Sequence, residues 1–405
     1  MKTLNSTPGA LRLLALSLAA RLPLVMLGIG LMVHTARLTG SYAAAGVVTG
    51  AHALAVGVGG PLLARVVDRR GQTLVLVAGA TVAAGLLAVV ACLPAGTPLP
   101  VLVALAAAIG FALPPVGACM RSLLPGLMPD PGAARSLYAV EASAVELTWV
   151  VGPPLALGLG ALISTGAALA IAGLALLVGT LAFAAQTSSR EWRPQRSAER
   201  VRGGALRSGA LQTLVVALVA VGVLVGAVEV AVAAAATSLG SSAAAGPLLG
   251  IWGVGSLAGG VLATRLGGGA RSARGLGLVL AALTAGHLVL AATAGSIAAM
   301  GAVLFVAGAA IAPTFASAYA MVDRAAPAGA VTEAFAWLAT ALAVGGAAGA
   351  AAGGAMADGA GPAAAFVLAG AAGAVAVLVT ALRAGTLCER PVRDARAGEL
   401  ILAAA

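Results

Sequence analysis

The chain has 405 residues, of which 61% are hydrophobic and only 9% are charged. Because a water-soluble domain needs about 25% charged residues to cover its surface, this composition excludes an ordinary soluble protein and predicts one that is embedded in lipid. The formal net charge of +10 could indicate a nucleic-acid partner. The charges stand in short segments between apolar runs, however, so we interpret them as a signal of membrane orientation and expect no nucleic-acid partner.

Twelve apolar runs are long enough to cross a bilayer, which takes about 20 helical residues. They are rich in Ala, Leu and Val and far longer than the strands of a membrane barrel, which have about 10 residues. The sequence therefore predicts an all-α membrane protein with helices over residues 11–36, 41–64, 73–94, 99–121, 137–163, 166–186, 211–238, 243–265, 276–294, 297–321, 331–356 and 362–383.

The basic residues fall almost entirely on one side of these predicted helices. That side carries the basic residues of the N-terminus, of the turns after the even-numbered helices and of the C-terminal tail, whereas the other side carries only Arg37. Short loops rich in Lys and Arg remain in the cytoplasm. We therefore expect a multi-pass protein of the plasma membrane with both termini in the cytoplasm.

One long polar segment divides the chain into halves of six helices each. We predict an N-terminal bundle over residues 1–186, a cytoplasmic linker over 187–210, a C-terminal bundle over 211–385 and a cytoplasmic tail over 386–405. The halves also resemble each other, since "GGPLLAR" at 59–65 aligns with "GGVLATR" at 259–265, and the acids Glu141 and Glu333 open similar segments. Such duplication predicts two pseudo-symmetric bundles, with a substrate site near the midplane between them.

Ionisable side chains inside the predicted helices are candidates for transport chemistry, because burying them in lipid is costly. Arg21 and Glu146 lie about 12–15 Å above the same end of their helices at 1.5 Å per residue, so we expect them to pair. Glu146 is our first candidate for a proton carrier. Glu229 on the seventh helix is a candidate for binding a cationic substrate, with a water-facing residue of the outer rim as the alternative. His52 could titrate near neutral pH, although a packing role is the alternative.

Small residues recur at four-residue spacing on several helices. Gly345, Gly349 and Gly353 form one such row, and Gly152 opens another on the fifth helix, beside Pro153. Rows of this kind let helices approach closely. The second, fifth, eighth and eleventh helices hold equivalent places in the two halves, and we expect their rows to form sliding interfaces.

Several short motifs resemble those of the major facilitator superfamily. Asp68, Arg69 and Gly71 match the D-R-x-G part of its loop signature between the second and third helices, and "GPP" at 152–154 resembles part of its antiporter signature. "ARLPL" at 20–24 and "GSYAAAG" at 40–46 look like an actinobacterial branch of drug or metabolite efflux proteins. The resemblance implies two rocking six-helix bundles around a central cavity.

The charged stretch "LARVVDRRGQTLVL" at 63–76 is expected to form a cytoplasmic turn that acts as a latch. An anion is stabilised at a helix N-terminus, so we expect Asp68 to contact the start of the eleventh helix. Arg65, Arg69 and Arg121 would hold this latch together with Glu141, and Glu333 would act as a second gate residue.

The sequence favours secondary transport of a small organic molecule by alternating access, with proton-coupled efflux as the preferred form. Uptake by proton symport and a non-transporting sensor or scaffold on the same fold are the alternatives. We expect no enzyme, cofactor or metal site, because the three histidines are scattered and the sequence shows no nucleophile–base pair. We expect the protein to act as a monomer in the bilayer.

Overall fold

A computed structural model describes residues 8–127, 131–193, 204–241, 244–327 and 329–387, all of them in helices or the turns between helices. Twelve spans in these ranges are long and apolar enough to cross a membrane, which confirms the predicted fold class. The predicted tail and residues 194–203 of the predicted linker lie outside the described residues, apart from a short stretch at the start of the tail.

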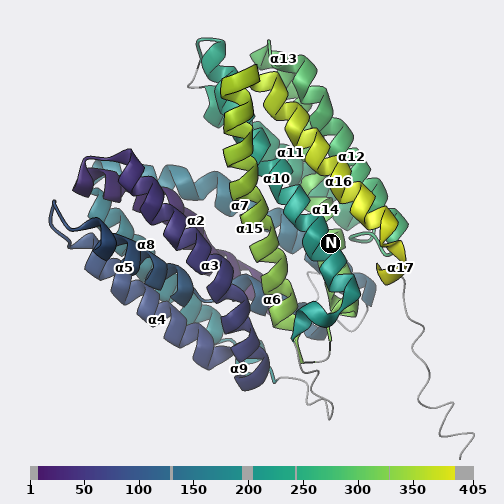
Figure 1. The fold of residues 1–405 in the computed structure, drawn as a ribbon. Coiled ribbons are helices and arrows are strands. Elements are labelled where there is room, and N and C mark those ends of the chain that lie inside the picture. The colour runs from purple at the N-terminus through teal and green to yellow at the C-terminus, as the bar shows by residue number, and fades with distance from the viewer. Residues whose placement is uncertain (1–7, 128–130, 194–203, 242–243, 328, 388–405) are drawn as a thin grey trace, which may run out of the picture.

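The first six spans lie together in one half of the molecule, drawn in purple to blue-green in Figure 1. A short helix, α9 (Thr187–Glu191), follows them. The six spans are α2 (Pro8–Thr39), α3 (Tyr42–Arg70), α4 (Gln72–Ala91), α5 with α6 (Leu99–Ala112 and Val116–Leu127), α7 (Pro131–Leu162) and α8 (Thr165–Ala184).

The last six spans form the other half, drawn in teal to yellow (Figure 1). A 3-10 turn, η1 (Ala205–Arg207), precedes them, and the short α17 (Ala384–Leu387) follows. The six spans are α10 (Gly209–Ser238), α11 (Ala245–Arg265), α12 (Ala273–Thr293), α13 with α14 (Ile297–Gly308 and Ile311–Ala325), α15 (Val331–Ala360) and α16 (Pro362–Leu382).

The fourth span of each half is broken near a proline. α5 and α6 are separated at Leu113–Pro115, and α13 and α14 at residues 309–310, shortly before Pro313. Proline lacks an N–H donor and its ring crowds the preceding turn, so the helical hydrogen bonds are interrupted at matching places. In each half, the helix after the break, α6 or α14, carries the charged and aromatic residues described below.

The two halves repeat the same internal packing. In the first half α2 packs against α7 and α8, and α3 packs against α5; in the second half the equivalent pairs are α10 with α15 and α16, and α11 with α13. The two most extensive contacts between the halves are equivalent, α3 with α15 and α7 with α11, and α7 also packs against α14 and α6 against α15. This confirms two pseudo-symmetric bundles that meet through the second, fifth, eighth and eleventh spans.

The glycine rows lie within the halves, which corrects the expectation that they form sliding interfaces. A Cβ atom added at Gly345 or Gly349 would overlap the main chain of α10 in the same half, and one at Gly353 would meet Ala227 of α10. Gly152 packs against Val25 of α2, while its neighbour Pro153 is half-buried. These glycines allow close packing inside each bundle.

The boundary between α7 and α11 has its own small residues. A Cβ atom at Gly253 would lie 3.2 Å from Val150, and one at Gly260 would overlap the Ser143 hydroxyl. Both glycines belong to α11, and both contacts are to α7 of the other half. Close approach across the boundary therefore depends on positions that the sequence patterns did not single out.

The charges of the 63–76 stretch lie on a helix, which corrects the predicted turn. α3 continues to Arg70, and the single residue Gly71 separates it from α4. Gly71 has φ 95° and ψ 168°, a conformation that side chains essentially exclude, and its N–H donates to the Val67 carbonyl at 2.8 Å. Arg65 and Asp68 therefore have directions fixed by the last turns of α3.

The outer surface of the bundle is apolar, as a bilayer requires. Leu54, Val82, Leu174 and Leu278 are each more than half exposed on the spans. Exposed large apolar side chains in such number mark contact with lipid. We call the end of the bundle where α3 meets α4 and α14 meets α15, which carries Arg70 and Arg324, the basic end.

Candidate functional site

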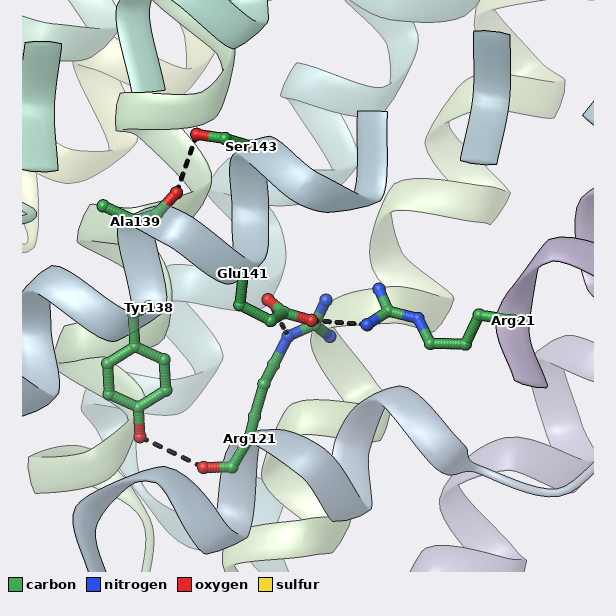
Figure 2. A network of polar contacts seen from close by, with 6 residues as sticks. All are labelled: Arg21, Arg121, Tyr138, Ala139, Glu141 and Ser143. Carbon is green, nitrogen blue, oxygen red and sulfur yellow. Dashed lines mark hydrogen bonds and ion pairs between the residues drawn. The ribbon is translucent and has the colours of Figure 1, made fainter. Parts of the chain in front are cut away.

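A buried carboxylate joins two arginines in the first half. Arg21 Nη1 on α2 donates to Glu141 Oε1 at 2.5 Å, and Arg121 Nε on α6 donates to Glu141 Oε2 at 3.1 Å. Figure 2 shows the two guanidinium groups converging on the carboxylate from different helices. We call these three residues the Arg–Glu–Arg network. They link the first, fourth and fifth spans at one point.

The network is buried and carries one formal positive charge more than negative. The Glu141 side chain has no exposure, whereas the side chains of Arg21 and Arg121 keep 10% and 7%. A buried ion needs a partner, since removing it from water costs several kcal/mol. Glu141 supplies one negative charge for the two guanidinium groups. The small exposed fraction of the network belongs to the two arginine side chains.

An aromatic layer borders the network and extends it to the second half. The Arg121 guanidinium carbon lies 3.9 Å from the ring centroid of Tyr319 on α14, within cation–π range. The ring of Phe335 on α15 lies 6.1 Å from that of Tyr319 and 6.0 Å from that of Tyr138 on α7. The Tyr138 hydroxyl donates to the Arg121 carbonyl at 3.3 Å (Figure 2). Rings from both halves therefore pack around Arg121.

The expected Arg21–Glu146 pair is wrong, because Arg21 pairs with Glu141. The two acids lie five positions apart on α7, and at 3.6 residues per turn their side chains point about 140° apart. They also lie about 7.5 Å apart along the helix axis at 1.5 Å per residue, and only Glu141 faces α2 and α6. Glu146 is half-buried and lies beside the Ser256 hydroxyl of α11.

The placement of Glu141 and Arg121 in a latch at the basic end is also wrong. α7 begins at Pro131, so Glu141 lies about 15 Å inside the helix at 1.5 Å per residue. Glu333, in contrast, stands in the first turn of α15. The two acids therefore do not hold equivalent places in the repeat, and the short sequence match between their segments is misleading.

Two further candidates lie away from the network. Glu229 on α10 is exposed at membrane depth in the second half. His52 is buried between α3 and α5, where its Nδ1 lies 3.3 Å from the Ala106 carbonyl oxygen. That contact is internal to the first bundle.

A second polar cluster joins α3 to α15 at the basic end. The carboxylate of Asp68 accepts hydrogen bonds from the main-chain N–H groups of Thr332 at 3.1 Å and Glu333 at 2.7 Å. These N–H groups belong to the first turn of α15 and have no intrahelical acceptor. Asp68 thus caps α15 from the other half, at the contact the sequence analysis expected. An acid there also interacts favourably with the helix dipole.

Arg65 and Glu333 form a two-pronged ion pair beside this cap. Arg65 Nη2 donates to Glu333 Oε1 at 2.6 Å, and Arg65 Nε donates to Oε2 at 3.0 Å. The Glu333 side chain is 2% exposed, while that of Arg65 is 38% exposed. Arg69, expected to hold the latch, is exposed on the last turn of α3 and takes no part in the pairs described here. We call Arg65, Asp68, Thr332 and Glu333 the latch.

The end of the central linker covers the latch. Gly204 has φ 74°, and a Cβ atom at that position would lie 2.6 Å from Arg65 Nη2 and 2.7 Å from Glu333 Oε1. The main chain of the next residue, Ala205, also hydrogen-bonds to the Glu333 carboxylate. The chain that connects the two halves therefore passes directly over the ion pair that joins them.

Sequence and structure comparisons decide the family. The family model described as Major Facilitator Superfamily matches residues 13–328, which is most of the chain. This chain belongs to the major facilitator superfamily. Family and fold together make it a membrane transporter. A search of curated proteins by sequence found no match.

Solved structures show the same fold. This superfamily member is similar to a bacterial homologue of the iron transporter ferroportin in an outward-facing state, with TM-score 0.71, 16% identity and coverage of 93% of this chain and 99% of that chain. It is also similar to the human organic anion transporter MFSD10, with TM-score 0.69, 16% identity and coverage of 92% and 100%. At this identity the likeness shows the fold alone.

Sequence reasoning missed the aromatic layer and Gly204. Tyr138, Tyr319 and Phe335 show no spacing motif, but the chain of this superfamily member has only three tyrosines. Two of the three lie in the layer. The rarity of tyrosine in this apolar sequence could therefore have marked these positions as candidate site residues. Gly204 is one of 56 glycines, and its role depends on a contact between distant segments that no local pattern encodes.

Proposed function

We propose that this superfamily member is a secondary active transporter that exports a small organic molecule in exchange for protons. Two pseudo-symmetric bundles would alternate between states open to either side of the membrane. The main support is the latch. It joins the halves through polar contacts at the ends of α3 and α15, and these contacts can break without disturbing the packing inside either bundle.

We propose that the basic end is cytoplasmic and that the protein lies in the plasma membrane with both termini inside. The distribution of Lys and Arg supports this orientation. The bundles would then be residues 1–186 and 211–385, with the linker 187–210 and the tail 386–405 in the cytoplasm, and the functional unit a monomer. With a cytoplasmic basic end closed by the latch, the conformation would be outward-facing, the state described for the ferroportin homologue.

Labelling of single cysteines tests this orientation. In intact cells, a membrane-impermeant maleimide should modify Arg37→Cys, which lies at the opposite end, and should modify Arg70→Cys only after the cells are opened. Both positions are exposed in the structure. The reverse pattern would refute the orientation.

We propose Glu146 as the proton carrier and Glu229 as a second acid in the transport path. Glu146 lies on α7 where it faces α11, so the charge on its carboxylate would act directly on a boundary that must change during alternating access. The "GPP" motif at 152–154 and the apolar spans support antiport, since a sugar symporter would need more Asn, Gln and aromatic groups.

The test measures transport in proteoliposomes with an imposed pH gradient. A panel of compounds is screened for proton release on addition, and a compound that moves is then followed with Glu146→Gln and Glu229→Gln. Glu146→Gln should abolish gradient-driven movement while leaving exchange at equal pH. Glu191→Gln, an exposed acid on α9, is the matched control. Unchanged gradient-driven transport by Glu146→Gln would rule out its role as proton carrier.

A further inference from the structure

The Arg–Glu–Arg network has more hydrogen-bond donors than acceptors. Each guanidinium group has five N–H donors. Among the described residues, Arg21 and Arg121 each donate one side-chain hydrogen bond, and both bonds go to Glu141. Most of their N–H groups therefore have no acceptor from the described part of the chain, although the residues are largely buried.

The surrounding groups do not remove this surplus of positive charge. Tyr319 presents its ring face to Arg121, which stabilises the cation without neutralising it. Glu146 is the next acid along α7, but it points toward α11 and not toward the arginines. Buried cations are normally paired, and in this network one carboxylate serves two guanidinium groups.

The main chain of α6 lies close to both guanidinium groups at a glycine. A Cβ atom added at Gly117 on α6 would lie 3.4 Å from Arg21 Nε and Cζ and 3.7 Å from Arg121 Nη1. Because this position is a glycine, the space that a Cβ atom would take beside both guanidinium groups has no side chain in it. The aromatic layer borders the network toward the basic end, because Tyr138 lies one turn nearer the start of α7 and Phe335 lies close to the start of α15.

We propose that Arg21 and Arg121 bind the anionic group of the transported molecule, a carboxylate, sulfonate or phosphate on a small organic anion. Guanidinium groups present paired N–H donors that match the oxygens of such groups. Glu141 holds both guanidinium groups in place and is a positioning residue. This inference rests on the proposed transport function and names its substrate class.

The network allows a test in which charge and structure give opposite predictions. Arg21→Gln leaves a neutral Arg121–Glu141 pair, so the fold is retained and anion binding falls at least tenfold. Glu141→Gln raises the net charge of the network and keeps one acceptor oxygen to position a guanidinium group, so a variant that folds should bind anions at least as tightly as the natural chain. A purely structural network predicts that both variants lose binding together. Arg21→Lys keeps the charge and should restore most of the binding, which keeps the proposal testable if Glu141→Gln fails to fold.

The binding assay uses the purified full chain in detergent and two probes of similar shape. These are 2-naphthalenesulfonate, a permanent anion, and 2-naphthyltrimethylammonium, a permanent cation, each followed by its effect on thermal unfolding. The sulfonate should stabilise the natural chain and the ammonium compound should not. Arg37→Gln is the control, because it removes an exposed charge from the same helix. Stabilisation by sodium chloride alone, equal to that by the sulfonate, would overturn an organic anion as ligand.

Flux of the same probes in proteoliposomes separates this inference from the proposed function. Sulfonate binding that follows the predicted order without any flux would support the anion site and count against transport. Flux of the ammonium compound, with no binding of the sulfonate, would overturn the anion site and leave transport standing.

Discussion

The main-chain N–H of Glu333 donates a 2.7 Å hydrogen bond to the carboxylate of Asp68, so the first turn of α15 is capped by a residue of the opposite half. The side chain of Glu333 is held at the same time by Arg65. One residue thus bears both polar contacts of the latch, through its main chain and through its carboxylate. Separation of the halves at the basic end must break both.

Replacing Asp68 with Asn should shift the protein toward states open at the basic end. The amide keeps one acceptor oxygen but loses the charge that strengthens the bonds to Thr332 and Glu333. Hydrogen bonds to charged groups contribute about 1.5–3 kcal/mol, so the equilibrium should change about 10- to 100-fold. Spin labels at positions 70 and 323, on exposed residues of opposite halves, would show a larger share of long distances.

The control for Asp68→Asn is Arg69→Gln on the neighbouring position. Arg69 is exposed on the same helical turn, so its replacement changes local charge without touching the cap. An unaltered distance distribution in Asp68→Asn would mean that the charge of this residue does not bias the conformational equilibrium.

Replacing Arg65 with Gln should have a smaller effect that depends on salt. The Arg65 side chain is 38% exposed, and an ion pair that solvent reaches contributes about 0–1 kcal/mol and is screened by ions. The same label distances should shift modestly at low ionic strength and return toward those of the natural chain at high ionic strength. The Asp68→Asn shift should persist, because Asp68 is buried. If the distances in both variants depended equally on salt, the proposed difference between the screened Arg65 ion pair and the buried Asp68 cap would be wrong.

The span pattern could be predicted because it follows from composition and length. Twelve apolar runs of the required length and the one-sided placement of Arg and Lys define the spans without any knowledge of packing. The breaks in the fourth and tenth spans also have a local cause, since Pro114 and Pro313 stand beside them. These features depend on neighbouring residues in the sequence.

The partners of the charged residues could not be predicted from depth alone. Two acids on α7 lie about 7.5 Å apart along the helix, and the position and rotation of that helix place Glu141 beside Arg21. That rotation is set by packing against several helices at once, including α2 and α11. The aromatic layer depends in the same way on three helices from both halves, so the site emerges only from the assembled fold.

Replacing Gly71 with Ala should destabilise the connection between α3 and α4. Gly71 has φ 95° and ψ 168°, and a side chain in this conformation costs about 1–3 kcal/mol. The thermal unfolding midpoint of the purified protein should fall, and the latch should weaken because Asp68 lies one turn away. Gly85→Ala on α4 is the control, since a Cβ atom there meets no atom within 4 Å. If the two variants had equal unfolding midpoints, the backbone at position 71 would be able to adopt another conformation without cost.

Replacing Gly349 with Ala should destabilise the second bundle itself. A Cβ atom at this position would overlap the main chain of Val223 on α10, and backbone cannot move aside as a flexible side chain can. Overpacking of this kind costs about 1–3 kcal/mol. Gly359→Ala lies on the same helix with no atom within 4 Å of the added Cβ, and it should gain about 0.5–1 kcal/mol because alanine favours a helix. The unfolding midpoints of the two variants should therefore shift in opposite directions.

The Gly349 contact lies inside one half, so the label distances between the halves should stay unchanged in both variants. A shift in these distances would place the glycine row at the moving interface.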